Sequence, residues 1–212
     1  MLQTVRDACK FDPKAIDYAL SEQIESLDDL VGHDAKAAEA FFRKTYVTGG
    51  MTTLLRQGLQ RLSGKSGQAV FELKQAMGGG KTHSMLALGY LAANPALAPL
   101  VPAEIVNGFT PAKARVVALS GRSISHEKHL WGDVAEQLGK AVQFLQFYKG
   151  SPQAPNEKDW VELIGDEPTL ILLDELPPYF GYGVTQRVGS GTLADVTVYA
   201  VSNLLLSISA EN

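Results

Sequence analysis

A glycine-rich stretch of the chain has the residue types that bind the phosphates of a nucleotide. Gly78, Gly79, Gly80, Lys81 and Thr82 follow one another and match the second half of the Walker A pattern, G-x-x-x-x-G-K-[ST]. Glycines let successive backbone amides turn toward phosphate oxygens, and a helix that begins there adds the positive end of its dipole. The lysine of this pattern bridges the β- and γ-phosphates, and the threonine hydroxyl ligates Mg²⁺. The spacing therefore predicts a phosphate-binding loop.

The beginning of this loop departs from the pattern. Gln75 stands where the pattern has its first glycine, and the two extra glycines inside the loop offer freedom that can offset the change. Ala76, Met77 and His83 complete the set of residues that we expect to contact the nucleotide. A glycine-rich turn with a surface lysine is the alternative interpretation. An apolar run before the loop and a helical pattern after it favour phosphate binding.

An acidic pair at the end of an apolar run supplies the second half of such a site. Asp174 and Glu175 follow the run TLILL, which reads as a buried strand. An aspartate in this place holds Mg²⁺ next to the threonine of the loop, and a neighbouring glutamate can accept a proton from the attacking water. Two solvated acids at the end of a strand are the simpler alternative, but the order of the two motifs is typical of a P-loop ATPase. We predict Thr82 and Asp174 at the metal, and Lys81 and Glu175 as catalytic residues.

The acidic pair also bears on the reaction. Kinases acting on small molecules need no glutamate beside the aspartate because their acceptor replaces water, so the pair favours hydrolysis. A GTPase would carry Asn-Lys-x-Asp, and residues 156–159 read NEKD, with the letters in another order. ATP with Mg²⁺ is therefore the expected ligand. A nucleotide-sensing switch or scaffold without hydrolysis stays open because of Gln75, as does a helical interaction module with an accidental motif.

The elements that must position these residues alternate along the chain. Apolar spacing predicts strands at 69–73, 115–120 and 169–175. It predicts helices at 13–27, 35–46, 51–62, 81–94, 129–148, 159–165 and 193–208. Loops are expected at the proline-rich 94–102 and the glycine-rich 177–196. Strands that are apolar throughout indicate an α/β fold with a parallel sheet covered by helices on both faces, and ligands of such sheets bind at the carboxyl ends of the strands. We predict a P-loop core of at least three parallel strands at 67–212, preceded by a helical segment at 1–66.

Composition excludes several other classes. The 212-residue chain carries a formal charge of −4 and one cysteine, Cys9, so an internal disulfide and a multi-cysteine zinc site are excluded. The amino terminus has no signal-peptide pattern, and no run approaches the ~20 apolar residues of a membrane helix, which predicts a cytoplasmic protein. His126 and His129 are three positions apart, whereas a zinc-protease helix needs four. The net charge gives no general attraction to nucleic acid, and a local basic patch stays open.

The strings FELKQAMGGGKTHSMLAL and LLDELPPYF resemble a bacterial and archaeal family of large predicted AAA+ ATPases, catalogued as domain of unknown function four-nine-nine. Members are often encoded beside DNA methylases in phage-defence gene clusters. The resemblance implies an ATP-hydrolysing module of a larger protein that works with other subunits of a defence or DNA-modification system and can form homo-oligomers. It also implies that this chain corresponds to the amino-terminal part, without the later sensor strand and arginine finger. We therefore expect it to bind ATP better than it hydrolyses it, and its last helix to expose apolar surface.

Overall fold

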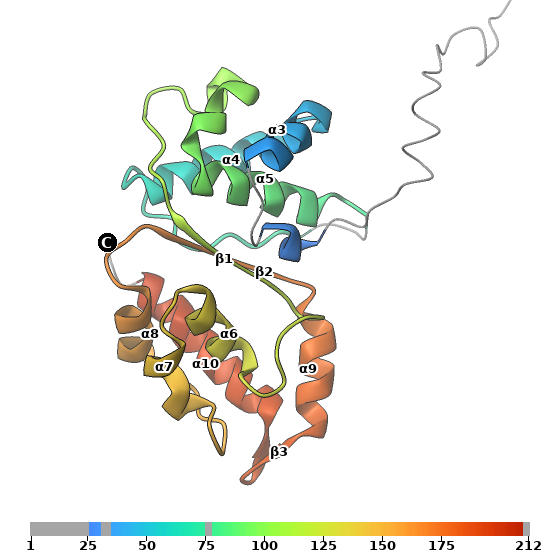
Figure 1. Cartoon of the computed structure of the whole chain (residues 1–212), viewed down its shortest axis with the longest axis vertical. Coiled ribbons are helices and arrows are strands. Elements are labelled where there is room, and N and C mark those ends of the chain that lie inside the picture. Colours follow the sequence, from blue (N-terminus) through green and yellow to red (C-terminus); the bar gives the residue numbers. More distant parts are fainter. Residues whose placement is uncertain (1–25, 31–34, 75–77, 210–212) are drawn as a thin grey trace, which may run out of the picture.

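Two parallel strands lie between two layers of helices in the computed structural model of the chain (Figure 1). The structure describes residues 26–30, 35–74 and 78–209. β1 (Arg115–Ser120) and β2 (Thr169–Asp174) pair in register from their first residues to their last, so Ser120 lies opposite Asp174. The α/β class with a parallel sheet is therefore confirmed. Because the strands are parallel, both carboxyl ends reach the same edge of the sheet.

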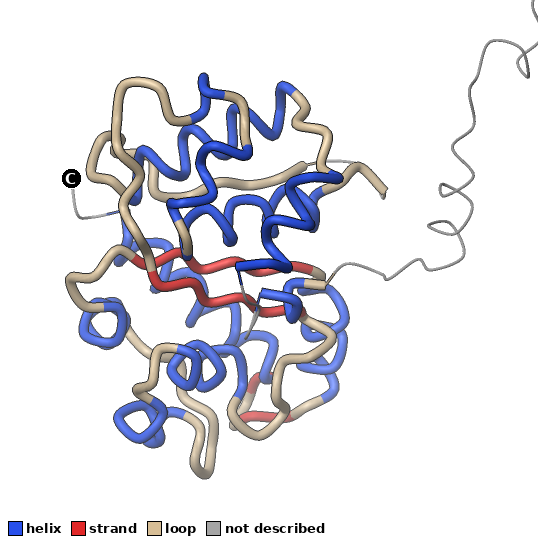
Figure 2. Tube along the Cα trace, turned by 45° about the horizontal axis from the view of Figure 1, so that its top comes forward, coloured by secondary structure: helices blue, strands red, loops and turns tan. Residues whose placement is uncertain are grey.

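Successive side chains of the two strands alternate between the layers, as the continuous apolar runs predict. Ala118 and Leu172 are buried in the core of one layer, and Val117 and Leu119 in the core of the other. Figure 2 shows blue helices on both sides of the red strands. The sheet thus separates two cores, and each strand contributes to both.

The first layer contains the glycine loop and the helices that precede and follow it along the chain, up to β1. Its helices are α3 (Ala35–Lys44), α4 (Gly49–Leu62) and α5 (Lys81–Ala93), with short 3₁₀ turns η1 (Leu27–Leu30), η2 (Pro95–Leu100) and η3 (Ala103–Ile105). Thr48 caps α4, since its hydroxyl accepts a hydrogen bond from the Met51 amide at 3.3 Å. The apolar faces of these helices pack together and fully bury Leu55, Leu59, Leu86, Leu91 and Ile105.

The second layer is formed by the segment between β1 and β2 and by the segment that follows β2. It comprises α6 (His129–Gln137), α7 (Ala141–Phe144), η4 (Leu145–Phe147), α8 (Glu157–Ile164), α9 (Leu176–Thr185), α10 (Leu193–Ser209) and a hairpin of β3 (Arg187–Val188) and β4 (Gly191–Thr192). Trp131 and Trp160 are fully buried in its core, and their indole N–H groups donate to Phe147 O and Ala200 O at 3.1 and 2.9 Å. Each large ring is thus packed without leaving its polar atom unpaired.

The expected strand at 69–73 is wrong, and the described residues contain two long parallel strands rather than three. Residues 66–74 have neither helical nor strand structure. Phe71 and Leu73 nevertheless pack against the core of the first layer. The apolar alternation of this segment is therefore satisfied by side-chain packing, whereas a strand also requires backbone pairing with a neighbour.

The predicted single helix at 129–148 is also wrong. It divides into α6, α7 and η4, because Gly139 adopts a left-handed conformation with φ 71° directly after α6. Glycine has no steric penalty there and ends the helix. The apolar spacing of the sequence continues past Gly139, but the residues after Gly139 do not extend the helix α6. Val142, which the spacing would place on the buried face of a longer helix, is therefore 86% exposed.

The glycine-rich segment that we expected to be a loop is mostly regular. It contains α9 and the β3–β4 hairpin, and Pro177 and Pro178 lie in the first turn of α9, where a missing N–H costs no helical hydrogen bond. Pro95 and Pro99 similarly lie in η2, and Pro102 is the N-cap of η3. The expected helix at 13–27 lies outside the described residues apart from its last positions, where Leu27 begins η1.

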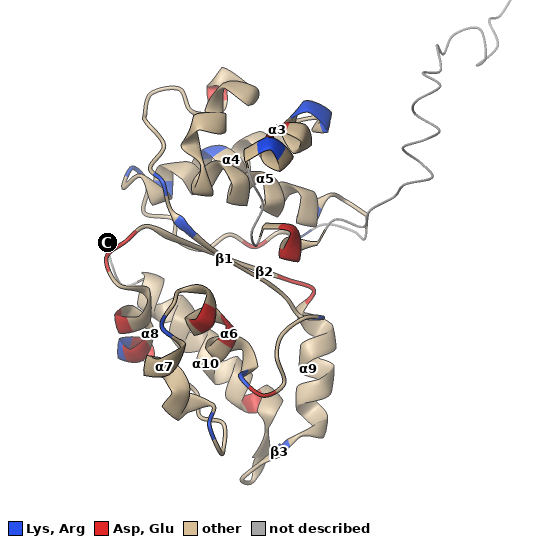
Figure 3. Cartoon of the chain, in the orientation of Figure 1, with Lys and Arg blue, Asp and Glu red and all other residues tan. Residues whose placement is uncertain are grey.

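The two layers differ in charge (Figure 3). Lys and Arg predominate on α3, on α4 and beside β1, whereas Asp and Glu gather on α8 and α6 and at the end of β2 next to α9. Within the described ranges no helix is long and apolar enough to cross a membrane.

Candidate nucleotide-binding site

The two motifs identified in the sequence meet at one point of the structure. The Thr82 hydroxyl donates a hydrogen bond of 2.5 Å to the Asp174 carboxylate, across 92 positions of the chain. Thr82 lies in the first turn of α5, and Asp174 is the last residue of β2. The site therefore lies where the amino terminus of α5 reaches the carboxyl edge of the sheet.

The glycine loop has backbone conformations that favour glycine. Gly78 and Gly80 have φ values of 77° and 76°, in the left-handed region. Gly80 is the N-cap of α5, and the first helical hydrogen bond runs from Ser84 N to Gly80 O at 2.9 Å. The amides between these two residues therefore precede the helical ladder and lie at the positive end of the helix dipole. Such an end suits an anion.

Not all of the predicted contact residues can be placed. Gln75, Ala76 and Met77 lie outside the described residues. Gly79 is exposed, and Lys81 is half-buried at the start of α5. Their roles in nucleotide binding stay predictions.

His83 connects the loop helix to the element before it. Its Nε2 lies 3.0 Å from the Thr45 hydroxyl, which donates its own proton to Phe41 O at 2.8 Å, so the imidazole is the donor. The His83 and Phe41 rings also contact each other, with centroids 4.4 Å apart. The segment between α3 and α4 is thereby held against the first turn of α5.

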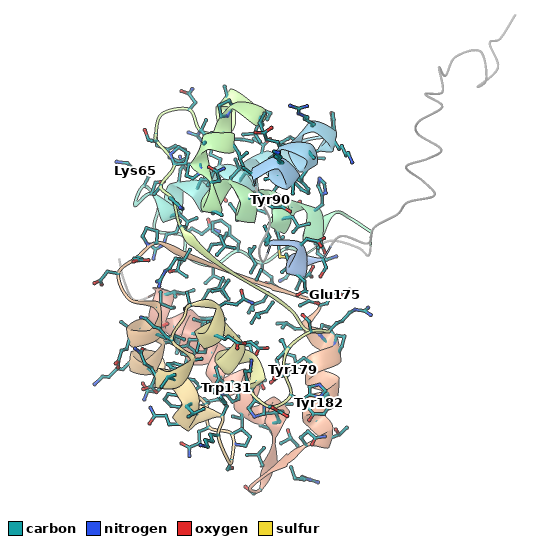
Figure 4. The ribbon with its side chains drawn as sticks, viewed as in Figure 1. Lys65, Tyr90, Trp131, Glu175, Tyr179 and Tyr182 are labelled. Carbon is teal, nitrogen blue, oxygen red and sulfur yellow. The ribbon has the colours of Figure 1, made fainter. Side chains whose placement is uncertain are left out.

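Glu175 is bound by an arginine that the sequence analysis did not single out. Arg122 Nε donates to Glu175 Oε2 at 2.6 Å, and both side chains are partly exposed. Glu175 has φ 47°, which is uncommon for a residue with a side chain, and it is the N-cap of α9 (Figure 4). Arg122 comes two residues after β1, so the parallel pairing of β1 with β2 was the signal that could have placed it beside the acidic pair.

Gly121 allows the close approach of these two strand ends. Its amide donates to Asp174 O at 2.8 Å, and a Cβ atom on this residue would lie 2.2 Å from Glu175 O. The turn that follows is held on both sides. Ser123 donates to Asp28 of η1 at 3.0 Å, and the His126 ring stacks on Tyr182 of α9 with centroids 3.7 Å apart.

Comparison with known families assigns the first half of this site. Residues 14–99 match the family model described as the DUF499 N-terminal domain. This part of the chain is similar to the amino-terminal domain of DUF499 proteins. The family predicted from the sequence is therefore confirmed, and its AAA+ architecture stays a prediction. No curated protein and no solved structure matches the chain.

The DUF499 match divides the site. It includes α3, α4, the glycines and the Lys81–Thr82 pair of α5, and it ends before β1 begins. Asp174, Glu175 and Arg122 therefore lie beyond the matched DUF499 range. Their placement beside it comes from the fold of the whole chain.

A histidine near the rim has unusual geometry without belonging to a metal site. His129 has φ 59°, is 7% exposed, and its Nδ1 has no hydrogen-bond partner among the described residues. Burial, and to a smaller extent the charge of His126, lowers its pKa below 6.5. The described residues contain no group of three or more His, Cys, Asp or Glu side chains that could hold a metal ion.

Proposed function

We propose that this chain binds ATP with Mg²⁺ and acts as the ATP-hydrolysing P-loop module of a larger AAA+-like protein. The observation that carries the proposal is the hydrogen bond of 2.5 Å between Thr82 and Asp174. A glycine-rich turn with a surface lysine would have no reason to lie against the acidic end of a strand so distant in the sequence.

The chemistry of this pair fits Mg²⁺. Both side chains offer oxygen atoms, and Mg²⁺ in nucleotide sites is held by one or two protein ligands together with waters and phosphate oxygens. A separate cluster of acidic residues is therefore not required. When bound, the ion neutralises charge on the β- and γ-phosphate oxygens.

The glycine loop fits the phosphates of the same ligand. Gly78 and Gly80 have the left-handed conformations that turn backbone amides toward an anion, and α5 directs its amino terminus to the same place. The Lys81 ammonium would bind the β- and γ-phosphates and stabilise the charge that develops during transfer.

Hydrolysis would require Glu175 to accept a proton from the attacking water. Its position next to Asp174 brings a carboxylate close to the proposed metal. The same carboxylate is engaged by Arg122 at 2.6 Å, so this contact would have to loosen before Glu175 could act as a base. A nucleotide-sensing switch with slow or no hydrolysis is the second candidate function, and the Arg122–Glu175 contact is the observation that favours it.

The family resemblance also suggests the biological process in which the chain acts. The resemblance to proteins encoded in phage-defence clusters supports a role beside other subunits of a defence or DNA-modification system. The full-length protein would then couple ATP binding or hydrolysis to those partners.

Binding of ATP by the purified chain tests the proposal directly. Isothermal titration calorimetry with ATP and Mg²⁺ should give saturable binding to the unaltered chain and none to Lys81→Ala. Lys65→Ala is the matched control, because Lys65 is an exposed lysine of the same layer, outside the proposed site (Figure 4). Equal ATP affinity of Lys81→Ala and the unaltered chain would refute the assignment. Loss of ATP turnover in Glu175→Gln, with binding retained, would separate an ATPase from a switch.

A further inference from the structure

Two aromatic side chains are largely exposed among the described residues. Tyr46 is 85% exposed between α3 and α4, and Tyr199 is 61% exposed on α10. An exposed aromatic ring presents a flat apolar face on which a nucleotide base can stack. Tyr46 differs from Tyr199 in directly following Thr45, which contacts His83 in the first turn of α5.

The position of Tyr46 is fixed by its two neighbours. Thr45 contacts His83 at 3.0 Å, and His83 directly follows Thr82 of the proposed phosphate site. Val47 packs against the core of the first layer. Thr45 and Val47 thus face the protein, while Tyr46 between them is exposed. The backbone of Tyr46 is therefore held next to a residue that contacts the first turn of α5.

The backbone around Tyr46 is also available to a ligand. No hydrogen bond involves the backbone N–H or C=O groups of Tyr46 and Val47 within the part of the chain that the structure describes. A purine base carries hydrogen-bond donors and acceptors along one edge, and these can pair with backbone N–H and C=O groups. The neighbouring aromatic rings are less suitable, because His83 and Phe41 pack on each other and Tyr90 packs on Phe41 with centroids 5.2 Å apart.

We propose that Tyr46 stacks on the base of the nucleotide whose phosphates lie on the glycine loop. The inference rests on the proposed function and adds the part of the site that recognises the base. The loop and α5 supply contacts to phosphates, which all nucleotides share. A ring beside them gives affinity that depends on the base.

The test compares two ligands that share phosphates but differ in the base. ATP and inorganic tripolyphosphate, each with Mg²⁺, are titrated into the unaltered chain and into Tyr46→Ala. Stacking on an aromatic side chain is worth ~1–3 kcal/mol per base, so Tyr46→Ala should weaken ATP binding by about 5- to 150-fold. The affinity for tripolyphosphate should not change. Tyr46→Phe should keep ATP affinity, because stacking needs the ring and not the hydroxyl group.

Tyr199→Ala is the control for loss of an exposed tyrosine and should bind ATP normally. The inference is wrong if Tyr46→Ala binds ATP as the unaltered chain does, or if it loses both ligands equally. It is also wrong, with the proposed function intact, if the unaltered chain binds ATP and tripolyphosphate with equal affinity. An unaltered chain that binds neither ligand would refute the proposed function and this inference together.

Discussion

Thr82 and Asp174 are joined by a hydrogen bond of 2.5 Å that connects the start of α5 to the end of β2. If this pair is the Mg²⁺ site, Asp174→Asn should weaken Mg²⁺-dependent ATP binding by about 10- to 100-fold, since the amide keeps the shape of the side chain but loses its charge. With EDTA in place of Mg²⁺, the variant should bind ATP at least as well as the unaltered chain, because a negative charge near the triphosphate has been removed. Calorimetry under both conditions measures the difference. An unchanged affinity for Mg²⁺-ATP would exclude Asp174 from the metal site.

Removal of Arg122 should release Glu175. Arg122→Ala is expected to raise ATP turnover by up to about fivefold, the rate equivalent of the ~1 kcal/mol that an exposed ion pair is worth. ATP affinity should stay the same. The rate is measured against Glu175→Gln as background. Lys128→Ala is the control, since it removes another ion pair of 2.6 Å, with Glu136, that includes no residue of the site. A lower rate in Arg122→Ala would instead make Arg122 necessary for the reaction.

Gly121 should not tolerate a side chain. A Cβ atom there would lie 2.2 Å from Glu175 O and 2.7 Å from Leu176 Cα, which are backbone atoms that cannot rotate away. Gly121→Ala should therefore lower the free energy of unfolding by at least about 1–3 kcal/mol. Gly181→Ala is the matched control within α9, where nothing lies within 4 Å of the added atom, and it should stabilise the protein by about 0.5–1 kcal/mol. Urea denaturation of both variants checks the contrast, and equal effects would show that the two strand ends are not as close as described.

Stability should decrease on mild acidification because of His129. Burial lowers its pKa in the folded protein below 6.5, so the unfolded chain takes up a proton first. The stability that the neutral imidazole contributes is present above pH 6.5 and is lost as the pH falls below it. His129→Asn should reduce this loss, since asparagine tolerates the left-handed conformation of φ 59° and does not titrate. The free energy of unfolding at pH 8, 7 and 6 measures the effect, and an equal pH dependence in both proteins would contradict it.

The Asp133 carboxylate must be considered in the same titration. Burial raises its pKa above 3.8, while a hydrogen bond of 2.7 Å from Ser125 N opposes that change. Its contribution has the opposite sign, because a carboxyl with a raised pKa loses stability as the pH increases through that pKa. His126→Ala keeps both buried groups and should still show the decrease that belongs to His129.

The sequence by itself determined the residues of the candidate site and most elements that hold them. The GGGKT string, the apolar runs that became β1 and β2, and the helical patterns of α3, α4, α5, α8 and α10 all depend on local spacing, which the fold preserves. The meeting of Thr82 with Asp174 was also predictable. The sequence predicted both motifs at the carboxyl edge of a parallel sheet, and Asp174 lies at that edge.

Only the tertiary structure decided the features that depend on neighbours distant in the chain. Residues 69–73 have the apolar pattern of a strand but form no strand pairing with the residues that the structure describes. The apolar spacing that continues past Gly139 includes Val142, which is exposed. Arg122 gains its role from the strand beside it, and Tyr46 gains its position from the Thr45–His83 contact. Side-chain spacing specifies which residues a segment can bury, whereas pairing and proximity depend on where the other segments lie.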